Sequence, residues 1–241
     1  MRRLIENNRI IHALDIKDLD RALEIAKMVE DYIDAIKVSQ LFVLRNGLRA
    51  INKLRESVSV PILTCFKTAD IPKISKEMIQ EIIDAGADGV TVHGFVGRDV
   101  VKECIRVANQ RDAYVFVITE MSHPGALDFM QKIGVKIAKM AKELNARGIV
   151  APATRPSRVG LYRKIVGNDM LIICPGIGAQ GGKLGDAILE GANFEIIGRS
   201  IYMAKDPRHV TYTLCSQLKV RLEEISKATQ YRVTALARDP Q

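Results

Sequence analysis

Short apolar segments rich in valine and isoleucine recur at fairly regular intervals along this chain, and amphipathic segments separate them. Near-continuous apolar segments of this length are typical of strands that are buried on both faces, as in a parallel sheet. The strands predicted in this way are Arg9–Asp15, Ala35–Val38, Val60–Phe66, Gly89–His93, Ala113–Thr119, Gly148–Ala151, Leu171–Cys174 and Phe194–Ile197.

The segments between these strands carry apolar residues with the 3.6-residue period of an amphipathic helix. They predict helices over Asp20–Val29, Ser75–Ala85, Val100–Asn109, Met130–Leu144 and Val159–Val166. Eight strand–helix units in 241 residues favour an α/β fold of the (β/α)8 TIM-barrel type, which usually takes about 250 residues. An open doubly wound sheet is the main alternative, but eight equal units without a break or linker favour the barrel.

The units form one domain, which we expect to span residues 1–228 as a (β/α)8 barrel. The stretch Asp206–Gln241 reads as a closing helix with an additional tail. Residues 229–241 have no partner in the eight-unit scheme, so this C-terminal tail either frays or packs under the barrel.

Composition narrows the class of protein further. A hydrophobic content of 47% is enough for a sizeable core. The sequence has neither an eighteen-residue apolar run nor a charged and then apolar leader, so we expect no membrane span and no secretory signal. The four cysteines, Cys65, Cys104, Cys174 and Cys215, follow no metal-ligand spacing, and the last three lie in apolar or helical contexts. Buried free thiols indicate a reduced, cytoplasmic protein.

The formal net charge of +8 suits an anionic partner, either a phosphorylated metabolite or a nucleic acid. The basic residues are spread over predicted helices together with acidic ones, and only 5% of residues are aromatic, which leaves little for base stacking. We therefore expect a small phosphorylated ligand and no nucleic acid.

Polar residues occur repeatedly at the C-terminal ends of the predicted strands or just after them. In a (β/α)8 barrel these ends meet at one mouth, where active sites lie. The residues concerned are Asp15, Lys37, Lys67, His93, Glu120, Ser122, Thr154, Arg155, Gln180 and Arg199.

Two glycine-containing loops predict a phosphate site. One follows the seventh strand and the other the eighth, which are the usual phosphate-binding loops of this barrel. Glycines let backbone N–H groups approach an anion, and a guanidinium binds phosphate oxygens in a bidentate manner. A glycine cluster by itself also fits a simple turn, but the two loops together favour phosphate binding. The candidate residues are Pro175, Gly176, Gly178, Gln180, Gly181, Gly198 and Arg199.

A charged cluster is expected beside this site, formed by Asp15, Lys37, Lys67 and Asp70. Any one of them alone is explained by a surface ion pair. Alternating charges at neighbouring strand ends would instead hold two ammonium groups charged and fixed in direction. Such a cluster suits a reaction that builds negative charge on carbon and then protonates it.

The side chain of Ser122, after the fifth predicted strand, is consistent with two roles. Its hydroxyl fits the polar edge of a heterocycle, and its spacing fits a helix N-cap equally well. No nearby histidine or acid marks Ser122 as a nucleophile. His93 and His123 lack the company of metal ligands, so we expect packed or hydrogen-bonded roles for both and no metal site.

The run Cys65-Phe66-Lys67-Thr68-Ala69-Asp70 closely resembles the signature Asp-x-Lys-x-x-Asp of orotidine 5′-phosphate decarboxylases, with a cysteine at the first aspartate. The resemblance is to the short archaeal type and extends from about residue 9 to residue 207. The other matching segments, in family order, are Ala13–Asp15, Ile36–Val38, Val92–Gly97, Glu120–Ala126, Ala151–Pro156, Pro175–Gly182 and Gly198–Tyr202.

The resemblance implies a decarboxylation of orotidine 5′-monophosphate to UMP that uses no cofactor, the last step of de novo pyrimidine synthesis. It implies that Lys67 protonates the C6 carbanion, while Lys37 and Asp15 hold the ribose hydroxyls. Ser122 would contact the pyrimidine, and Gln180, Arg199 and the Gly198 amide would bind the phosphate. The family is a homodimer in which Asp70 reaches the neighbouring site, and Ile71 and Ile74 are further substrate-binding positions.

Three departures from the family pattern surround the same mouth. Cys65 replaces an aspartate that is thought to crowd the substrate carboxylate, Ile74 replaces a threonine, and Ser39–Phe42 replaces a Gly-aromatic-Pro run. They indicate a weakened or retuned enzyme, or an altered variant of an active one. One alternative is a catalytically inactive barrel that binds UMP or orotidine 5′-monophosphate.

A second alternative is a sugar-phosphate decarboxylase or synthase of the same superfamily, such as a ketogulonate-phosphate decarboxylase or a hexulose-phosphate synthase. Those relatives share a similar Asp-x-Lys-x-x-Asp run. They lack the Ser-His-Pro-Gly and Pro-Gly-Ile-Gly-Ala-Gln-Gly-Gly segments that are present here.

Overall fold

A computed structural model describes the backbone of residues 1–236 and the side chains of residues 1–225. Across the described residues, eight parallel strands form one closed barrel in sequential order. Ile11 of the first strand pairs with Ala35 of the second and with Ile196 of the last, which closes the ring. The predicted (β/α)8 barrel is confirmed, and the alternative of an open sheet is excluded.

The strands consist mostly of β-branched and other apolar residues, which fit a pleated surface buried on both faces. All eight predicted strands are present, within a few residues of their expected bounds. They are β1 (Ile10–Ala13), β2 (Ala35–Ser39), β3 (Ile62–Thr68), β4 (Gly89–His93), β5 (Tyr114–Ile118), β6 (Gly148–Val150), β7 (Leu171–Pro175) and β8 (Phe194–Ile197).

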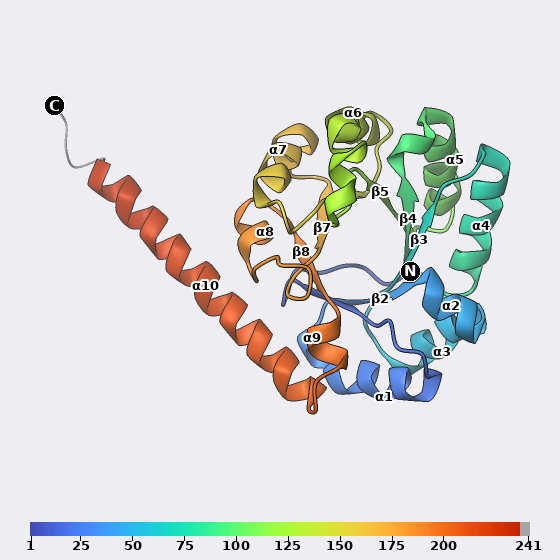
Figure 1. The fold of residues 1–241 in the computed structure, drawn as a ribbon, viewed down its shortest axis with the longest axis horizontal. Coiled ribbons are helices and arrows are strands. Elements are labelled where there is room, and N and C mark those ends of the chain that lie inside the picture. Colours follow the sequence, from blue (N-terminus) through green and yellow to red (C-terminus); the bar gives the residue numbers. More distant parts are fainter. Residues whose placement is uncertain (237–241) are drawn as a thin grey trace.

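Helices surround the strands as an outer ring (Figure 1). The five predicted helices are confirmed as α1 (Leu19–Val29), α4 (Pro72–Asp84), α5 (Arg98–Asn109), α6 (Met130–Glu143) and α7 (Pro156–Val166). Elements that the periodicity did not predict are α2 (Gln40–Asn46), α3 (Arg49–Ser57), α8 (Asp186–Leu189), α9 (Arg199–Tyr202), and the 3-10 turns η1 (Glu30–Tyr32), η2 (Gly94–Val96) and η3 (Pro124–Leu127). Most of these are too short to display a full amphipathic period.

Alternation along the strands produces two apolar layers, because successive side chains point to opposite faces. Inside the barrel, side chains such as Ile11, Leu63, Phe116 and Phe194 form one buried cluster. The opposite faces of the strands pack against the helices in a second, larger cluster. The interior of the barrel is therefore a packed core, and only its rim is left for a ligand.

The last helix, α10 (Pro207–Leu236), contacts α1, α9 and η1 near its start. Leu218 of α10 is buried, and Arg221 forms an ion pair with Asp186 of α8. Beyond this point α10 extends away from the ring (Figure 1). The expected boundary at residue 228 falls inside α10, and residues 237–241 lie outside the described residues, so the division into barrel and tail stays a prediction.

The cysteines agree with the expectation of free thiols. Cys104, Cys174 and Cys215 are buried, Cys65 is half-buried, and all four are unpaired. Among the described residues, no helix combines the length and apolar character needed to cross a membrane.

Candidate functional site

A cavity of about 500 Å³ opens at the C-terminal ends of the strands. All eight strands, or the loops directly after them, contribute to its wall. The lining residues are Ala13, Asp15, Lys37, Ser39, Cys65, Lys67, Thr91, Ile118, Met121, Ser122, His123, Pro124, Val150, Ile173, Pro175, Gly176, Ile177, Ala179, Gln180, Ile196, Gly198, Arg199 and Tyr202. The structure thus brings most of the predicted polar residues to one mouth.

The first part of the cavity wall contains a carboxylate, Asp15, and an ammonium group, Lys37, which come from the neighbouring strand–helix units of β1 and β2. Asp15 follows β1, and its Oδ1 accepts a hydrogen bond from the backbone N–H of Ser39 at 3.0 Å. Its Oδ2 lies 3.9 Å from Nζ of Lys37, whose side chain is only 10% exposed. Ser39 also caps α2, because its Oγ accepts from the N–H of Phe42. The carboxylate is therefore fixed by backbone that the α2 cap holds in place.

The second part of the wall comes from β3, where the strand is irregular. Thr64 pairs with Val90 of β4, and the pairing resumes only at Thr68 with Val92. Cys65 and Lys67 both line the cavity from this bulged segment. The backbone of Lys67 has a φ of +51°. This value lies in the left-handed region, which residues other than glycine rarely adopt. Non-glycine residues held in this region cluster at functional sites.

The predicted phosphate end lies on the opposite side of the mouth. Gly176 has a φ of +116°, and a Cβ there would lie 3.1 Å from Cβ of Ser122, so the loop needs glycine at this position. Its turn is closed by hydrogen bonds from the Gly178 N–H to the Gly182 carbonyl and from the Gly181 N–H to the Gly178 carbonyl.

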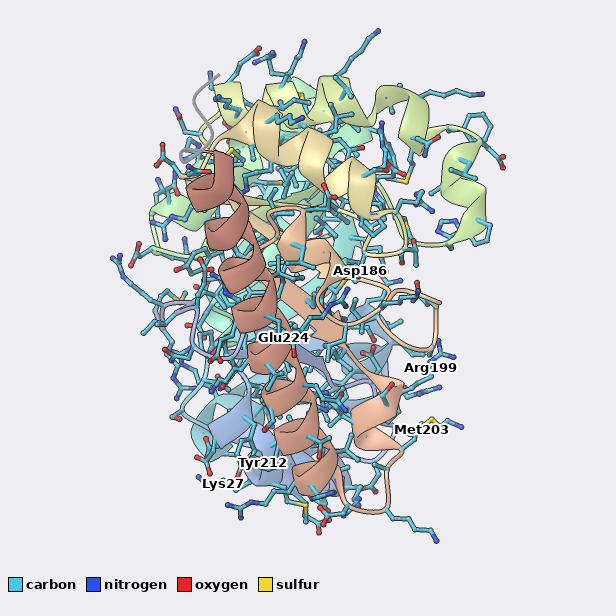
Figure 2. All side chains as sticks on the ribbon, turned by 90° about the vertical axis from the view of Figure 1, so that its left-hand side faces the viewer. Lys27, Asp186, Arg199, Met203, Tyr212 and Glu224 are labelled. Atoms are coloured by element: carbon cyan, nitrogen blue, oxygen red, sulfur yellow. The ribbon has the colours of Figure 1, made fainter. Side chains whose placement is uncertain are left out.

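Arg199 begins α9 directly after Gly198 and lines the same cavity. Its side chain points away from α10 at the edge of the molecule (Figure 2). Within residues 1–225 no carboxylate pairs with its guanidinium, so its hydrogen-bond donors are open to an anion.

Ser122 and Gln180 connect the loops after β5 and β7 across the cavity. The Oγ of Ser122 donates to Oε1 of Gln180 at 2.5 Å. The N-cap reading of Ser122 is wrong, since η3 begins with His123 at its N-cap and without a side-chain cap.

Five predicted site residues lie outside the cavity wall. Gly178 and Gly181 shape the loop after β7. Asp70 and Ile71 are exposed at the start of α4, where Oδ1 of Asp70 accepts from the N–H of Ile71. Ile74 lines a second hollow of about 510 Å³ together with Phe66 and Leu48.

Other polar residues at the strand ends have structural roles. Glu120 is fully buried and accepts hydrogen bonds from Arg155, Arg158 and Tyr162. The ring of His93 packs 4.5 Å from that of Phe95, which confirms a packed role. Burial, with a further contribution from the charge of Lys67, lowers the pKa of His93 to about 4.

Sequence reasoning missed the apolar floor of the cavity and two polar side chains in its wall. The floor is formed by Ile118, Val150, Ile173 and Ile196, and its signal is the inward alternation along each strand. Thr91 lies two residues before His93 and shares its face, so the same alternation identifies it. Tyr202 carried no such signal because it belongs to the short α9; burial and the nearby Asp15 raise its pKa.

The fold and the cavity define a (β/α)8-barrel protein with charged residues at the C-terminal mouth, where Arg199 and the glycine-containing loop after β7 line the same cavity. A family model described as "Orotidine 5'-phosphate decarboxylase / HUMPS family" matches residues 8–213. This chain therefore belongs to the orotidine 5′-phosphate decarboxylase / HUMPS family.

Curated relatives support the same assignment over nearly their full length. The orotidine 5′-phosphate decarboxylase of Methanosarcina barkeri is 46% identical over 215 residues, which are 89% of this chain and 96% of the relative. That of Thermococcus kodakarensis is 41% identical over 214 residues, covering 89% of this chain and 98% of the relative.

Solved structures agree with both fold and family. The crystal structure of orotidine 5′-monophosphate decarboxylase from Methanocaldococcus jannaschii, complexed with the inhibitor BMP, superposes with a TM-score of 0.83 at 40% identity. It covers 87% of this chain and 98% of that chain. The enzyme from Pyrococcus horikoshii gives a TM-score of 0.80 at 40% identity, with 87% and 99% covered.

Proposed function

We propose that this chain decarboxylates orotidine 5′-monophosphate to UMP, the last step of pyrimidine nucleotide synthesis. The observation that carries the proposal is the meeting of Lys67, Lys37 and Asp15 with Gln180 and Arg199 in one cavity. The curated relatives that match along most of the chain are named for this reaction.

In the proposed binding mode the 5′-phosphate lies at the Arg199 end. The guanidinium, the Gly198 amide and Gln180 bind its oxygens, and Ser122 contacts the pyrimidine. Lys37 and Asp15 hold the ribose hydroxyls. Binding energy from the phosphate, which is remote from the reacting carbon, then serves to position the base over Lys67.

The proposed reaction breaks the bond between C6 and its carboxylate carbon. Carbon dioxide leaves, and the electron pair stays on C6. The Lys67 ammonium donates a proton to C6, and the resulting neutral amine regains a proton from water after release of UMP. Charged groups already fixed around C6 stabilise the developing carbanion, since they need not reorganise during the reaction. The proposed steps require no cofactor.

Cys65 is the position where the resemblance predicts a lower rate. A neutral thiol neither repels a substrate carboxylate nor pairs with a lysine. A loss of about 4 to 7 kcal/mol of transition-state stabilisation corresponds to a rate lower by about 10³ to 10⁵. Because such enzymes begin with a very large acceleration, turnover remains measurable after a loss of this size.

The proposal includes a homodimer in which Asp70 reaches the neighbouring site. Its support is the apolar character of the surface next to Asp70 at the start of α4, where Ile71 is 61% exposed and Ile74 38%. Apolar patches of this kind beside a polar residue are typical of interfaces between subunits. We also propose that the enzyme works in the cytoplasm, which its unpaired cysteines support.

Complementation tests the shared site. Lys67→Ala and Asp70→Asn variants, each impaired alone, are mixed after partial denaturation and refolding. If Asp70 serves the partner's site, about a quarter of the parent activity returns, because half of random dimers are mixed and each mixed dimer has one intact site. A mixture of Lys67→Ala with Lys37→Ala is the control, since these residues belong to the same cavity and no intact site forms. Equal activities in the two mixtures contradict the shared site.

The reaction is tested by mixing the purified protein with orotidine 5′-monophosphate and following the loss of the substrate's ultraviolet band. A Cys65→Asp variant is assayed alongside, and Lys67→Ala serves as the inactive control. We expect turnover by both chains, much faster for Cys65→Asp, with little change in UMP affinity.

Two other outcomes identify the alternatives. UMP binding without turnover by the parent, with activity only in Cys65→Asp, indicates an inactive nucleotide-binding barrel. If neither the parent nor the Cys65→Asp chain converts orotidine 5′-monophosphate, the result contradicts the proposal and favours a sugar phosphate as substrate.

A further inference from the structure

The β3–β4 pairing is interrupted where the site is built. Thr64 pairs with Val90 and Thr68 with Val92, so the three residues between Thr64 and Thr68 face the single residue Thr91 of β4. Such a bulge leaves backbone groups without ladder partners and changes the direction of side chains. Two of the three bulged residues, Cys65 and Lys67, line the cavity.

The backbone of Lys67 is held in this bulge by one side chain of the opposite strand. Its φ of +51° is a conformation that a residue with a Cβ adopts only when its surroundings impose it. The backbone N–H of Lys67 donates to Oγ1 of Thr91 at 3.0 Å. The hydroxyl therefore accepts the bond that a regular ladder would have given to a carbonyl.

Thr91 is well suited to fix this geometry. It is 3% exposed, so its own position is set by packing. It also lines the cavity, directly beside the residue that it holds. Because the bond is made to the backbone of Lys67, it constrains the point from which the lysine side chain starts.

We infer that Thr91 is a positioning residue, whose hydroxyl keeps the β3 bulge and thereby directs the Lys67 ammonium to the reacting carbon. The inference rests on the proposed role of Lys67 as proton donor. Without the hydroxyl, the partly buried N–H of Lys67 loses its acceptor, and the segment shifts toward a regular ladder. A regular ladder would replace the left-handed backbone of Lys67 with an extended one and so change the direction of its side chain. The ammonium would then no longer point to the substrate.

Kinetics of matched variants test the inference. Thr91→Val keeps the shape and removes the acceptor, whereas Thr91→Ser keeps the acceptor. Thr64→Val is the control, since it removes a buried hydroxyl bond between the same strands, from Oγ1 of Thr64 to the Gly89 carbonyl, without touching Lys67. Each substitution is made in the parent and in the Cys65→Asp chain.

We expect kcat to fall by about 10² in Thr91→Val, the cost of a misplacement of roughly 1 Å. The Kd of UMP should change less than twofold, because the proposed phosphate-binding residues are unchanged in this variant. Thr91→Ser should restore most of kcat, and Thr64→Val should keep it. A Thr91→Val chain with the kcat of the Thr64→Val control overturns the inference.

Amide hydrogen exchange of Lys67 gives a readout that does not depend on the reaction. Exchange at this amide should be at least about tenfold faster in Thr91→Val and unchanged in Thr91→Ser, since a hydrogen-bonded amide exchanges only when the bond opens. Unchanged exchange in Thr91→Val overturns the inference even if neither background decarboxylates the substrate. If the amide exchanges faster in Thr91→Val but neither the parent nor the Cys65→Asp chain decarboxylates the substrate, the result supports the positioning of Lys67 by Thr91. It then contradicts only the proposed function.

Discussion

The Oγ of Ser122 and the Oε1 of Gln180 lie 2.5 Å apart, joined by a hydrogen bond between loops that follow different strands of the barrel. Both residues line the cavity, and both belong to loops at its open side. The bond links the loop after β5 to the loop after β7, where the proposed phosphate site lies. One hydrogen bond thus couples the proposed pyrimidine contact to the proposed phosphate contact.

This coupling predicts that the two residues do not contribute independently to nucleotide binding. Ser122→Ala and Gln180→Ala should each weaken UMP binding, but the double variant should bind more tightly than the two separate losses predict. For a shared hydrogen bond we expect a coupling of about 1 kcal/mol, or roughly fivefold in Kd. Calorimetric titration of the four chains measures it, and additive losses would contradict the coupling.

Arg199 should discriminate between a nucleotide and a nucleoside. Its removal in Arg199→Ala should raise the Kd of UMP by about 10²-fold, the value of a charge-assisted hydrogen-bonded pair, and leave the Kd of uridine unchanged. Lys205→Ala is the matched control, because Lys205 is exposed and does not line the cavity. If Lys205→Ala weakens UMP binding equally, the effect comes from overall charge and not from a phosphate contact.

Glu120 should matter for stability and not for binding. Burial raises the pKa of this carboxyl, but hydrogen bonds from Tyr162, Arg158 and Arg155 outweigh burial and hold the pKa below its usual range. Replacing one member of such a buried network leaves the others unpaired. We therefore expect Glu120→Ala to lower the free energy of unfolding by about 3 to 5 kcal/mol.

Urea denaturation measures this loss. Glu103→Ala is the control: it breaks an exposed ion pair with Arg106 and should leave the free energy of unfolding nearly unchanged. Equal effects of the two substitutions would argue against a stabilising network at Glu120.

His12 should make the protein less stable in mild acid. Its ring is fully buried, with Nδ1 3.1 Å from the carbonyl of Ile197, and burial lowers its pKa to about 4. Since the unfolded chain takes up the proton near pH 6.5 and the folded chain does not, stability falls between pH 6.5 and 4. At pH 5 this single group costs about 2 kcal/mol.

The measurement compares the parent with His12→Asn at pH 7 and pH 5. The variant cannot titrate at this position, so its disadvantage in unfolding free energy should shrink by about 2 kcal/mol on going to pH 5. A difference between the two chains that does not change with pH would show that His12 does not titrate as expected.

Much of this protein could be predicted from local patterns. The near-continuous apolar segments and the 3.6-period segments gave the order of strands and helices. Burial on both faces of a strand leaves an unbroken apolar run, and burial on one face of a helix leaves a period of 3.6 residues. Since parallel strands of a closed barrel all end at one rim, the same order brought Asp15, Lys37, Lys67 and Arg199 to one mouth. The run from Cys65 to Asp70 gave the family resemblance, which the family match then supported.

Other features depended on contacts between distant segments. Glu120 and Ser122 are two residues apart and both follow β5, yet Glu120 is buried with Arg155 and Arg158 while Ser122 faces Gln180. Nothing in the local pattern separates these roles, because the path of the loop decides which polar atoms meet.

The sequence by itself thus determined the barrel, its rim of charged residues and the thiol at position 65, since periodicity and residue type are local properties. Only the tertiary structure decided how the rim is used. The left-handed Lys67 and its bond to Thr91 arise from a register shift between two strands. A register is a property of the pair of strands, and neither strand alone encodes it.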